Sequence, residues 1–453
     1  MSKPTPDHVD ADPSLLVPEV LLLADGVFAA VGPAERLIRE HPHLTPVRLD
    51  GHLLMPGFVD AHHHLTQSFG SSLAFGEPSE IFRRVWVPLE GALDEESAYL
   101  AAKLAALESL RGGFTTVAEA GTRAPVDADV VGRATADAGI RCVLGQVVCS
   151  DPDTPPQAAA DALATAEKHL SHYEHHDLLH PSLALPTPES ATEETLRSAA
   201  DLVREAGAVL QIHVNEHLAG VERALLHHGM RPLEYLHSVG VLGPWLLGAH
   251  ATLVTPRELT LLRETGAAIS YNPVASAWKG NAVAPASAMA EAGIRFGLGT
   301  DGTRGDAFRL VDAAETAQRL AFGLHTGDSS CGGGWTWLEH ATRLGADAVG
   351  LGSLTGTITP GRAADFLLVD LAVPELAPSW DLPWELVRLV GRDQITAVVV
   401  AGRLRLWEGW PLDWDGPALV ETAARVGREI GARTPVTRVH PTSTEHRARS
   451  GAQ

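Results

Sequence analysis

Cysteine is scarce in this sequence. Three of the 453 residues are cysteines, Cys142, Cys149 and Cys331, and no two of them have the Cys-x-x-Cys spacing. A disulfide framework needs paired cysteines, and a cysteine-ligated zinc site needs cysteines close together. We therefore expect neither of these two features.

Basic charge and long apolar runs are lacking as well. There are 35 Lys and Arg residues against 56 Asp and Glu residues, a net charge of −21. The absence of a basic stripe argues against a nucleic-acid or anionic-membrane partner. No apolar run approaches the roughly 20 residues of a membrane-spanning helix, and Met1 to Pro13 lack the apolar region of a signal peptide. We expect a cytoplasmic protein with a small-molecule ligand.

The sequence does contain a regular alternation of strand and helix patterns. Strand patterns occur at residues 58–64, 115–117, 141–148, 178–185, 209–213, 245–250, 267–271 and 295–301. Such alternation predicts a parallel sheet, and eight units over about 250 residues have the size of a (β/α)8 barrel. The expected fold class is therefore α/β, a TIM barrel.

Shorter strand patterns with Asp-Gly and Pro-Gly turns flank this region on both sides. We expect them to form one small β-sandwich domain built from both chain ends. The predicted organisation is residues 1–55 and 357–412 for the β-sandwich and residues 56–356 for the barrel. A C-terminal helix and a poorly ordered tail are expected at residues 413–453.

The most informative stretch runs from Met55 to Leu65 and contains three consecutive histidines. Side chains alternate faces along a strand, so His62 and His64 point the same way, close enough to share a metal ion. His63 points to the other side, and we expect a structural role for it. A second histidine-rich stretch, His169 to His180, lies on an expected outer helix, where we predict a solvated face.

Polar residues also follow other predicted strands. His213, His250 and Asp301 each end a strand pattern, and Glu216 comes three residues after His213. The active site of a (β/α)8 barrel is built at the carboxyl ends of its strands. We therefore expect these side chains to converge with His62 and His64. Imidazoles and one carboxylate suit Zn²⁺ or Fe²⁺ and leave a position open for water.

Several motifs resemble those of the amidohydrolase superfamily. They are Pro56-Gly-Phe-Val-Asp-Ala-His-His-His64, His213-Val-Asn-Glu216, Gly248-Ala-His250, Gly299-Thr-Asp301-Gly and Gly361-Arg-Ala-Ala-Asp365. The closest resemblance is to the aminohydrolase branch, with its guanine, 8-oxoguanine and S-adenosylhomocysteine deaminases and its triazine hydrolases. It covers residues 21 to 409, nearly the whole chain.

The resemblance implies a set of roles. One divalent metal, Zn²⁺ or alternatively Fe²⁺, is bound by His62, His64, His213 and Asp301. His250 and Asp301 flank the attacking water, and Glu216 carries protons as general acid and base. The implied reaction is hydrolytic deamination of a small amino-substituted heterocycle, of the purine, pterin, pyrimidine or triazine type. In it a metal-bound hydroxide attacks the ring and ammonia leaves, and the subunits are expected to form a homodimer or tetramer.

One absence bears on the number of metals. Members of the superfamily with two metals bridge them with a carbamylated lysine at the end of the fourth strand. Residues 178–187, which include that position here, contain no lysine. A single metal is therefore the better prediction.

The substrate cannot be predicted from the resemblance, because the chain departs from the family pattern where specificity is set. After the seventh strand, relatives often have His-Cys-Pro followed by Ser-Asn. This chain has Tyr271-Asn-Pro-Val-Ala-Ser276 instead. Candidate substrate-binding residues are Gln67, Trp86, Glu119 and Asn272. Gln67 would read a heterocycle edge, and Trp86 would either stack on a ring or pack against its neighbours. Glu119 would either select a cationic or amino-bearing substrate or be a solvated loop carboxylate.

Two alternatives stay open. The same site could expel another leaving group, as a chlorohydrolase, an N-alkylamine hydrolase or a formimino or guanidino deiminase does. A barrel that has lost its chemistry could serve as a scaffold, although all the expected ligands are present. A dinucleotide-binding fold is unsupported, because no Gly-x-Gly-x-x-Gly follows a strand. The nucleobase deaminases with a Pro-Cys-x-x-Cys zinc motif are excluded by the cysteine spacing.

Overall fold

The structure is a computed structural model that describes residues 19–77, 81–150, 153–173 and 175–439. The predicted tail beyond residue 439 lies outside these residues. Among the described helices, none is both long and apolar enough to cross a membrane.

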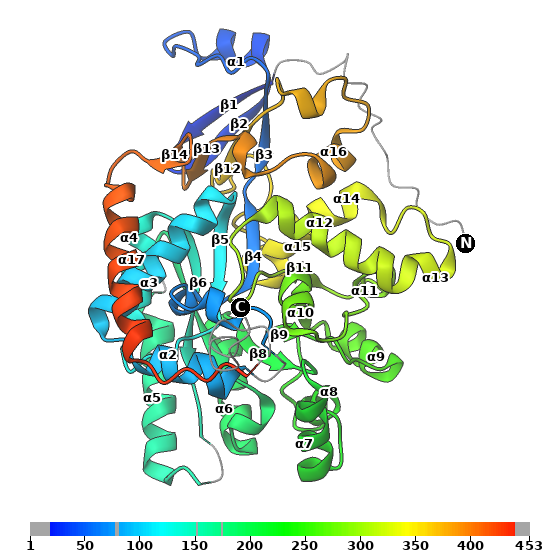
Figure 1. The fold of residues 1–453 in the computed structure, drawn as a ribbon. Coiled ribbons are helices and arrows are strands. Elements are labelled where there is room, and N and C mark those ends of the chain that lie inside the picture. The colour runs from blue at the N-terminus through cyan, green and yellow to red at the C-terminus, as the bar shows by residue number, and fades with distance from the viewer. Residues whose placement is uncertain (1–18, 78–80, 151–152, 174, 440–453) are drawn as a thin grey trace, which may run out of the picture.

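Eight parallel strands form a barrel, as the alternating pattern predicts (Figure 1). They are β4 (Phe58–His63), β5 (Phe114–Glu119), β6 (Arg141–Val147), β7 (Leu179–Leu185), β8 (Leu210–Val214), β9 (Leu246–His250), β10 (Ala268–Tyr271) and β11 (Phe296–Leu298). Each strand pairs with the next in sequence order. The ring closes between β11 and β4 through a bridge of His63 with Asp301 and a 2.8 Å hydrogen bond from the Asp301 N–H to the His62 carbonyl.

The last strand is shorter than predicted. The sequence pattern extends it to Asp301, but β11 ends at Leu298. Asp301 has φ 58°, in the left-handed region, which is incompatible with an extended strand. Asp301 therefore belongs to the turn that follows the strand.

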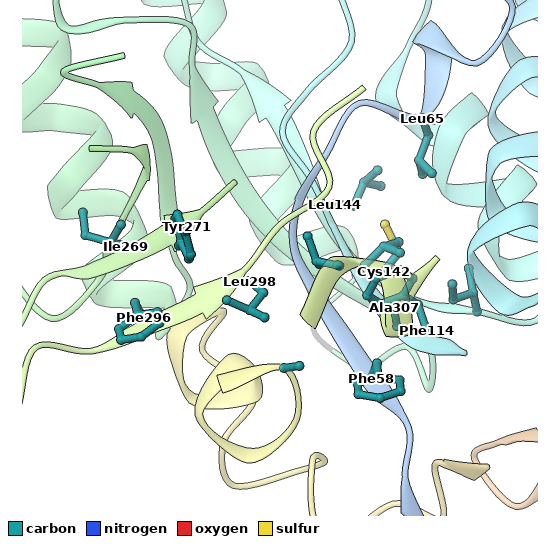
Figure 2. Packing of buried hydrophobic residues seen from close by; sticks show 14 of the residues in the cluster. Phe58, Leu65, Phe114, Cys142, Leu144, Ile269, Tyr271, Phe296, Leu298 and Ala307 are labelled. Atoms are coloured by element: carbon teal, nitrogen blue, oxygen red, sulfur yellow. The ribbon is translucent and has the colours of Figure 1, made fainter. Parts of the chain in front are cut away.

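Outer helices cover the barrel. They include α3 (Glu95–Arg111), α4 (Ala128–Ala138), α5 (Pro156–His172), α6 (Glu193–Ala206), α9 (Pro256–Thr265) and α12 (Ala307–Gln318). Figure 2 shows buried side chains between strands and helices, among them Phe58, Phe114 and Leu298. The Phe58 ring packs edge-on against Phe308 of α12, with 5.1 Å between centroids. The terminal helix α17 (Gly416–Arg433) packs along α3.

The small domain is built from both chain ends, as predicted. β1 (Glu19–Ala24) and β2 (Val27–Pro33) form an antiparallel pair. β3 (His52–Pro56) joins β12 (Phe366–Asp370), β13 (Ile395–Val400), β14 (Arg403–Trp407) and β15 (Trp410–Pro411) in an antiparallel sheet of order β15-β14-β13-β12-β3. Phe28 of β2 and Phe366 of β12 meet in the core that the two sheets share.

The chain passes from this domain into the barrel at Gly57. β3 ends at Pro56 and β4 begins at Phe58, so one residue joins two sheets. A Cβ atom at Gly57 would lie 2.1 Å from Thr115 Oγ1 of the neighbouring strand, which only glycine avoids. The Pro-Gly pair that opens the histidine motif therefore sets how β4 enters the barrel.

A buried ion pair ties the amino end of the barrel to the small domain. Arg141, the first residue of β6, donates from Nε to Asp365 Oδ2 at 2.9 Å and from Nη2 to Oδ1 at 3.2 Å. The carboxylate also accepts the Thr355 hydroxyl and the Ala401 N–H, each at 2.7 Å. Asp365, the last residue of the Gly361-Arg-Ala-Ala-Asp365 motif, thus joins the two parts of the chain.

Candidate active site and metal centre

Four imidazoles meet at the carboxyl end of the barrel. His62 and His64 come from the end of β4, His213 from β8 and His250 from β9. The His62 ring centroid lies 4.9 Å from that of His64, 4.8 Å from that of His213 and 5.5 Å from that of His250. The structure therefore brings together histidines that are far apart in sequence, at the edge where barrel chemistry is expected.

The donor atoms of this cluster form two overlapping sets that could hold a metal ion. The nitrogens of His62, His64 and His213 lie within 4.8 Å of one another, as do the donor atoms of His62, His250 and Asp301. His64 Nε2 and His213 Nε2 are 3.3 Å apart, and two nitrogens on one tetrahedral zinc at about 2.0–2.1 Å lie about 3.4 Å apart. His62 Nε2 is buried and has no hydrogen-bond partner among the described residues.

The charge state of the histidines suits metal binding. Burial lowers the pKa of His213 to about 3, with a further contribution from His250. Burial also lowers the pKa values of His62 and His64 well below the ordinary value. A neutral imidazole offers a lone pair that a protonated one lacks, so these side chains are ready ligands at neutral pH.

Asp301 directs its two carboxylate oxygens to different partners. Oδ1 lies 3.9 Å from His62 Nε2 and 3.7 Å from His64 Nε2, and it accepts the Gly302 N–H at 2.8 Å. Oδ2 lies 3.8 Å from His250 Nε2 and 2.6 Å from Lys279 Nζ. Burial alone would raise the pKa of Asp301, but Lys279 and the histidines hold it well below its usual range.

His250 is fixed by Asn272. The Ser270 hydroxyl donates to Asn272 Oδ1 at 2.7 Å, which orients the amide, and the Asn272 amide nitrogen lies 3.2 Å from His250 Nδ1. If Asn272 donates, the proton of His250 is on Nε2, which points toward Glu216 and Asp301. Asn272 is fully buried, and the substrate contact predicted for it stays a prediction. The His250 backbone has φ 75°, a strained conformation typical of functional sites.

Glu216 lies beside the imidazoles. Its Oε1 is 3.7 Å from His250 Nε2, 3.2 Å from His217 Nε2 and 2.9 Å from Lys279 Nζ. Burial would raise its pKa, but His250, Lys279 and His217 together lower the pKa well below the ordinary value. The Thr252 hydroxyl donates to the Glu216 carbonyl at 2.8 Å and holds this segment against the end of β9.

Lys279 is the functional residue that the sequence reasoning missed. It is the last residue of α10 (Pro273–Lys279), a short helix that begins immediately after β10 and Asn272. The sequence did contain a signal for Lys279. Residues 271–276 depart from the family pattern, and they lead into the helix that carries this lysine. A lysine in the segment between β10 and β11, which lies at the active-site edge, was the specific feature to follow.

A small pocket of about 20 Å³ opens beside Asp301. Gln67 and Trp86, both predicted substrate contacts, line it together with Trp278 and Lys279. A Cβ atom at position 302 would lie 2.4 Å from Gln67 Oε1, so Gly302 makes room for this amide. Substrate contact by these two side chains stays a prediction, and their position is compatible with it.

The substrate contact predicted for Glu119 stays a prediction. Its side chain is buried, and its Oε2 accepts the Leu65 N–H at 2.7 Å. It is not among the residues that line the pocket. Burial raises its pKa to about 7.

Two groups of histidines lie outside the cluster. His63 points away from it, with Nδ1 2.9 Å from Asp60 Oδ2 and 2.7 Å from the Thr300 hydroxyl. In the second histidine-rich stretch, His172, His175 and His176 are exposed. The predicted solvated face is wrong for His169, which is buried with Nε2 2.9 Å from the Leu144 carbonyl, because α5 packs this side chain against β6.

A (β/α)8 barrel with imidazoles and carboxylates at its carboxyl end defines the class of metal-dependent hydrolases. Residues 53–405 match the model of the amidohydrolase family. The chain belongs to the amidohydrolase family. This membership confirms the resemblance and the prediction of a hydrolase that acts on carbon–nitrogen bonds.

Individual relatives agree. A 5-methylthioadenosine/S-adenosylhomocysteine deaminase of Syntrophobacter fumaroxidans is 28% identical over 427 residues, which cover 93% of this chain and 96% of the relative. An adenosine deaminase from Xanthomonas campestris, solved with bound zinc, superposes with a TM-score of 0.83 at 26% identity, covering 91% of this chain and 94% of the other. An atrazine chlorohydrolase from Arthrobacter aurescens shares the fold, with a TM-score of 0.76 at 20% identity over 90% of this chain and 94% of the other.

Proposed function

We propose that this protein is a metal-dependent aminohydrolase that removes the amine of a small amino-substituted heterocycle as ammonia. The observation that carries the proposal is the position of Glu216, whose carboxylate lies 3.7 Å from His250 Nε2 beside the metal donor set. A metal site next to a carboxylate that can move protons is the combination that hydrolytic deamination needs. Relatives named as deaminases of adenosine-type compounds support the proposal.

His62, His64, His213 and Asp301 would hold the metal, and we propose zinc, with one ion per chain. The bound zinc of the similar adenosine deaminase supports the choice of metal, and the absence of lysine from residues 178–187 supports the count. Such a metal, when bound, lowers the pKa of water from 15.7 to about 7 and so provides a nucleophile at neutral pH.

The remaining steps belong to the side chains. The Nε2 of His250 and Oδ2 of Asp301, 3.8 Å apart, orient the attacking water between them. Glu216 accepts the water's proton and delivers it to the ring nitrogen beside the amine-bearing carbon, then carries a second proton to the leaving amine. Trp86 would stack on the flat ring, and Gln67 would read its edge. Asn272 acts behind His250 and keeps its orientation.

The proposal is tested with purified protein, metal analysis and an ammonia assay. We expect about one zinc per chain and ammonia release from members of a panel of aminopurines, aminopyrimidines, aminopterins and aminotriazines. Treatment with a chelator should abolish ammonia release, and added zinc should restore it. Chloride or alkylamine release without ammonia would replace the proposal by the alternative leaving groups. Full activity in metal-free protein would contradict it.

We also propose a homodimer or tetramer and a cytoplasmic location. Large apolar side chains that are exposed support self-association, among them Leu320, Leu324, Trp335 and Trp380. Light scattering coupled to size-exclusion chromatography tests the oligomeric state, and a monomer at micromolar concentration would contradict the proposed dimer or tetramer.

A further inference from the structure

Lys279 connects the two carboxylates that the proposed reaction uses. Its Nζ lies 2.9 Å from Glu216 Oε1 and 2.6 Å from Asp301 Oδ2. The side chain is 16% exposed, so the ammonium is largely removed from solvent. Lys279 ends α10, and Gly280, with φ 68°, stops the helix there. The helix end therefore fixes the ammonium at the centre of the site.

The ammonium has bonding capacity left for a ligand. A lysine ammonium carries three N–H donors, and Glu216 and Asp301 use two of them. The third has no partner among the described residues. Lys279 lines the same small pocket as Gln67 and Trp86, so a ring acceptor that reaches this pocket lies beside the ammonium.

The position next to Glu216 indicates where on the ring this acceptor lies. Glu216 is proposed to protonate the ring nitrogen beside the amine-bearing carbon. That nitrogen is bonded to one other ring atom. A substituent on this second ring atom lies beside the protonated nitrogen. It therefore also lies beside any group that is hydrogen-bonded to the Glu216 carboxylate. Lys279, His217 and Asn281 all lie against this carboxylate, and of these three Lys279 lines the pocket. A carbonyl oxygen at this place would accept a charge-assisted hydrogen bond, whereas a C–H group would leave the buried donor unpaired.

We propose that Lys279 is a specificity-determining residue that selects amino-heterocycles with a carbonyl oxygen on the ring carbon across the protonated nitrogen from the amine. Cytosine and isoguanine have this pattern, whereas adenine has a C–H group there. This inference rests on the proposed function, since it names the substrate class of the same site. It sets this chain apart from relatives named for adenosine-type substrates.

Matched substrate pairs test the proposal. Isoguanosine differs from adenosine by the carbonyl at the critical carbon, and cytosine differs from 4-aminopyrimidine in the same way. With zinc-loaded wild-type protein, we expect kcat/KM to be higher for the carbonyl member of a pair. In Lys279→Met that preference should fall by about 10- to 100-fold, the usual effect of losing a hydrogen bond to a charged group. The intrinsic reactivity of the two rings cancels when the variant is compared with wild type.

A second measurement reports binding without turnover. Calorimetry on zinc-loaded Glu216→Gln and on Glu216→Gln/Lys279→Met should show that the second substitution weakens binding of isoguanosine by a similar factor and leaves adenosine nearly unchanged. Lys168→Met is the matched control, because Lys168 is exposed on the outer helix α5. It should alter neither ratio. A lysine that only braces Glu216 and Asp301 would affect both members of a pair equally.

The outcomes separate the two proposals. If the protein deaminates these substrates and the carbonyl preference of Lys279→Met stays within about twofold of the wild-type preference, the role of Lys279 is overturned and the proposed function is kept. If binding shows a carbonyl preference that depends on Lys279 but the wild-type protein releases no ammonia, the selective role of Lys279 is supported and the proposed deaminase activity is overturned. The absence of both binding and turnover for every pair overturns the selection of this substrate class.

Discussion

Two buried clusters of charged and polar side chains lie at opposite ends of the barrel, and they differ in how completely they are paired. At the amino end, all three nitrogens of the Arg141 guanidinium and both oxygens of Asp365 have protein partners. At the carboxyl end, His62 Nε2 and His250 Nε2 are buried without a hydrogen-bond partner among the described residues.

The backbone differs in the same way. His250 and Asp301, at the carboxyl end, have φ 75° and 58°, whereas Arg141 and Asp365 are not among the residues with positive φ. Buried polar groups are normally satisfied, and strained backbone persists where the surrounding structure enforces it. A cluster whose polar atoms all have protein partners contributes to stability. A cluster with unpaired polar atoms and a strained backbone is available to bind a ligand. Substitutions in the two clusters should therefore affect different measurable properties.

The largest expected effect is on turnover, at the carboxyl end. Glu216→Gln keeps the size of the side chain but removes its ability to carry protons. We expect kcat to fall by about 10²- to 10⁴-fold, measured by ammonia release, while zinc content stays near one per chain. A variant that retains wild-type kcat would remove Glu216 from the mechanism, and a variant that loses zinc would make Glu216 part of the metal site.

The next largest effect is on stability, at the amino end. Asp365→Ala leaves the Arg141 charge buried and unpaired, which costs about 3–5 kcal/mol in the free energy of unfolding. The kcat of the folded fraction should stay unchanged, because the cluster lies at the other end of the barrel. Urea denaturation measures the loss. Asp393→Ala is the control, since Asp393 is exposed in the same small domain, and equal losses for both variants would contradict the comparison.

The amino end should also carry part of the acid sensitivity. Burial and the neighbouring Arg141 lower the pKa of His180 from 6.5 to about 4. Below pH 6.5 the unfolded chain binds a proton that the folded protein does not, so stability is lost as the pH falls from about 6.5 to about 4. The loss amounts to about 1–3 kcal/mol, because one pKa unit is about 1.4 kcal/mol and the side chain is partly exposed.

His180→Gln should flatten this part of the profile, measured as the free energy of urea unfolding between pH 7.5 and 4.5. His172→Gln, on the exposed side of α5, is the control. An unchanged pH dependence in His180→Gln would show that other groups carry the acid sensitivity.

The smallest expected effect concerns Trp86, which lines the pocket and is itself buried. If its ring stacks on the substrate, Trp86→Leu should raise KM by about 2- to 12-fold, which corresponds to about 0.5–1.5 kcal/mol of aromatic contact. Trp335→Leu, at an exposed position, serves as the control. A loss of stability with unchanged KM would assign Trp86 to packing and not to the pocket.

Sequence patterns predicted most of the barrel but not its irregular positions. All eight predicted strands are present, because the hydrophobic pattern of each strand is local and strongly constrained by burial on both faces. The end of β11 was predicted three residues too far along the chain, because no local pattern showed that the strand ends at Leu298 and that the backbone reaches a positive φ at Asp301. His169 was misjudged because its helical face packs inward against β6.

The sequence by itself determined the fold, the family and the side chains that meet at the carboxyl end of the barrel. The fold and the convergence of these side chains follow from local periodicity and from one geometric rule about strand ends, and the family follows from the resemblance of the motifs. Only the tertiary structure decided that Asp365 pairs with Arg141, 224 residues away, that Asn272 lies behind His250, and that Lys279 joins Glu216 to Asp301. Each of these contacts depends on where a turn or a short helix places a side chain in three dimensions, and no spacing along the chain encodes that position.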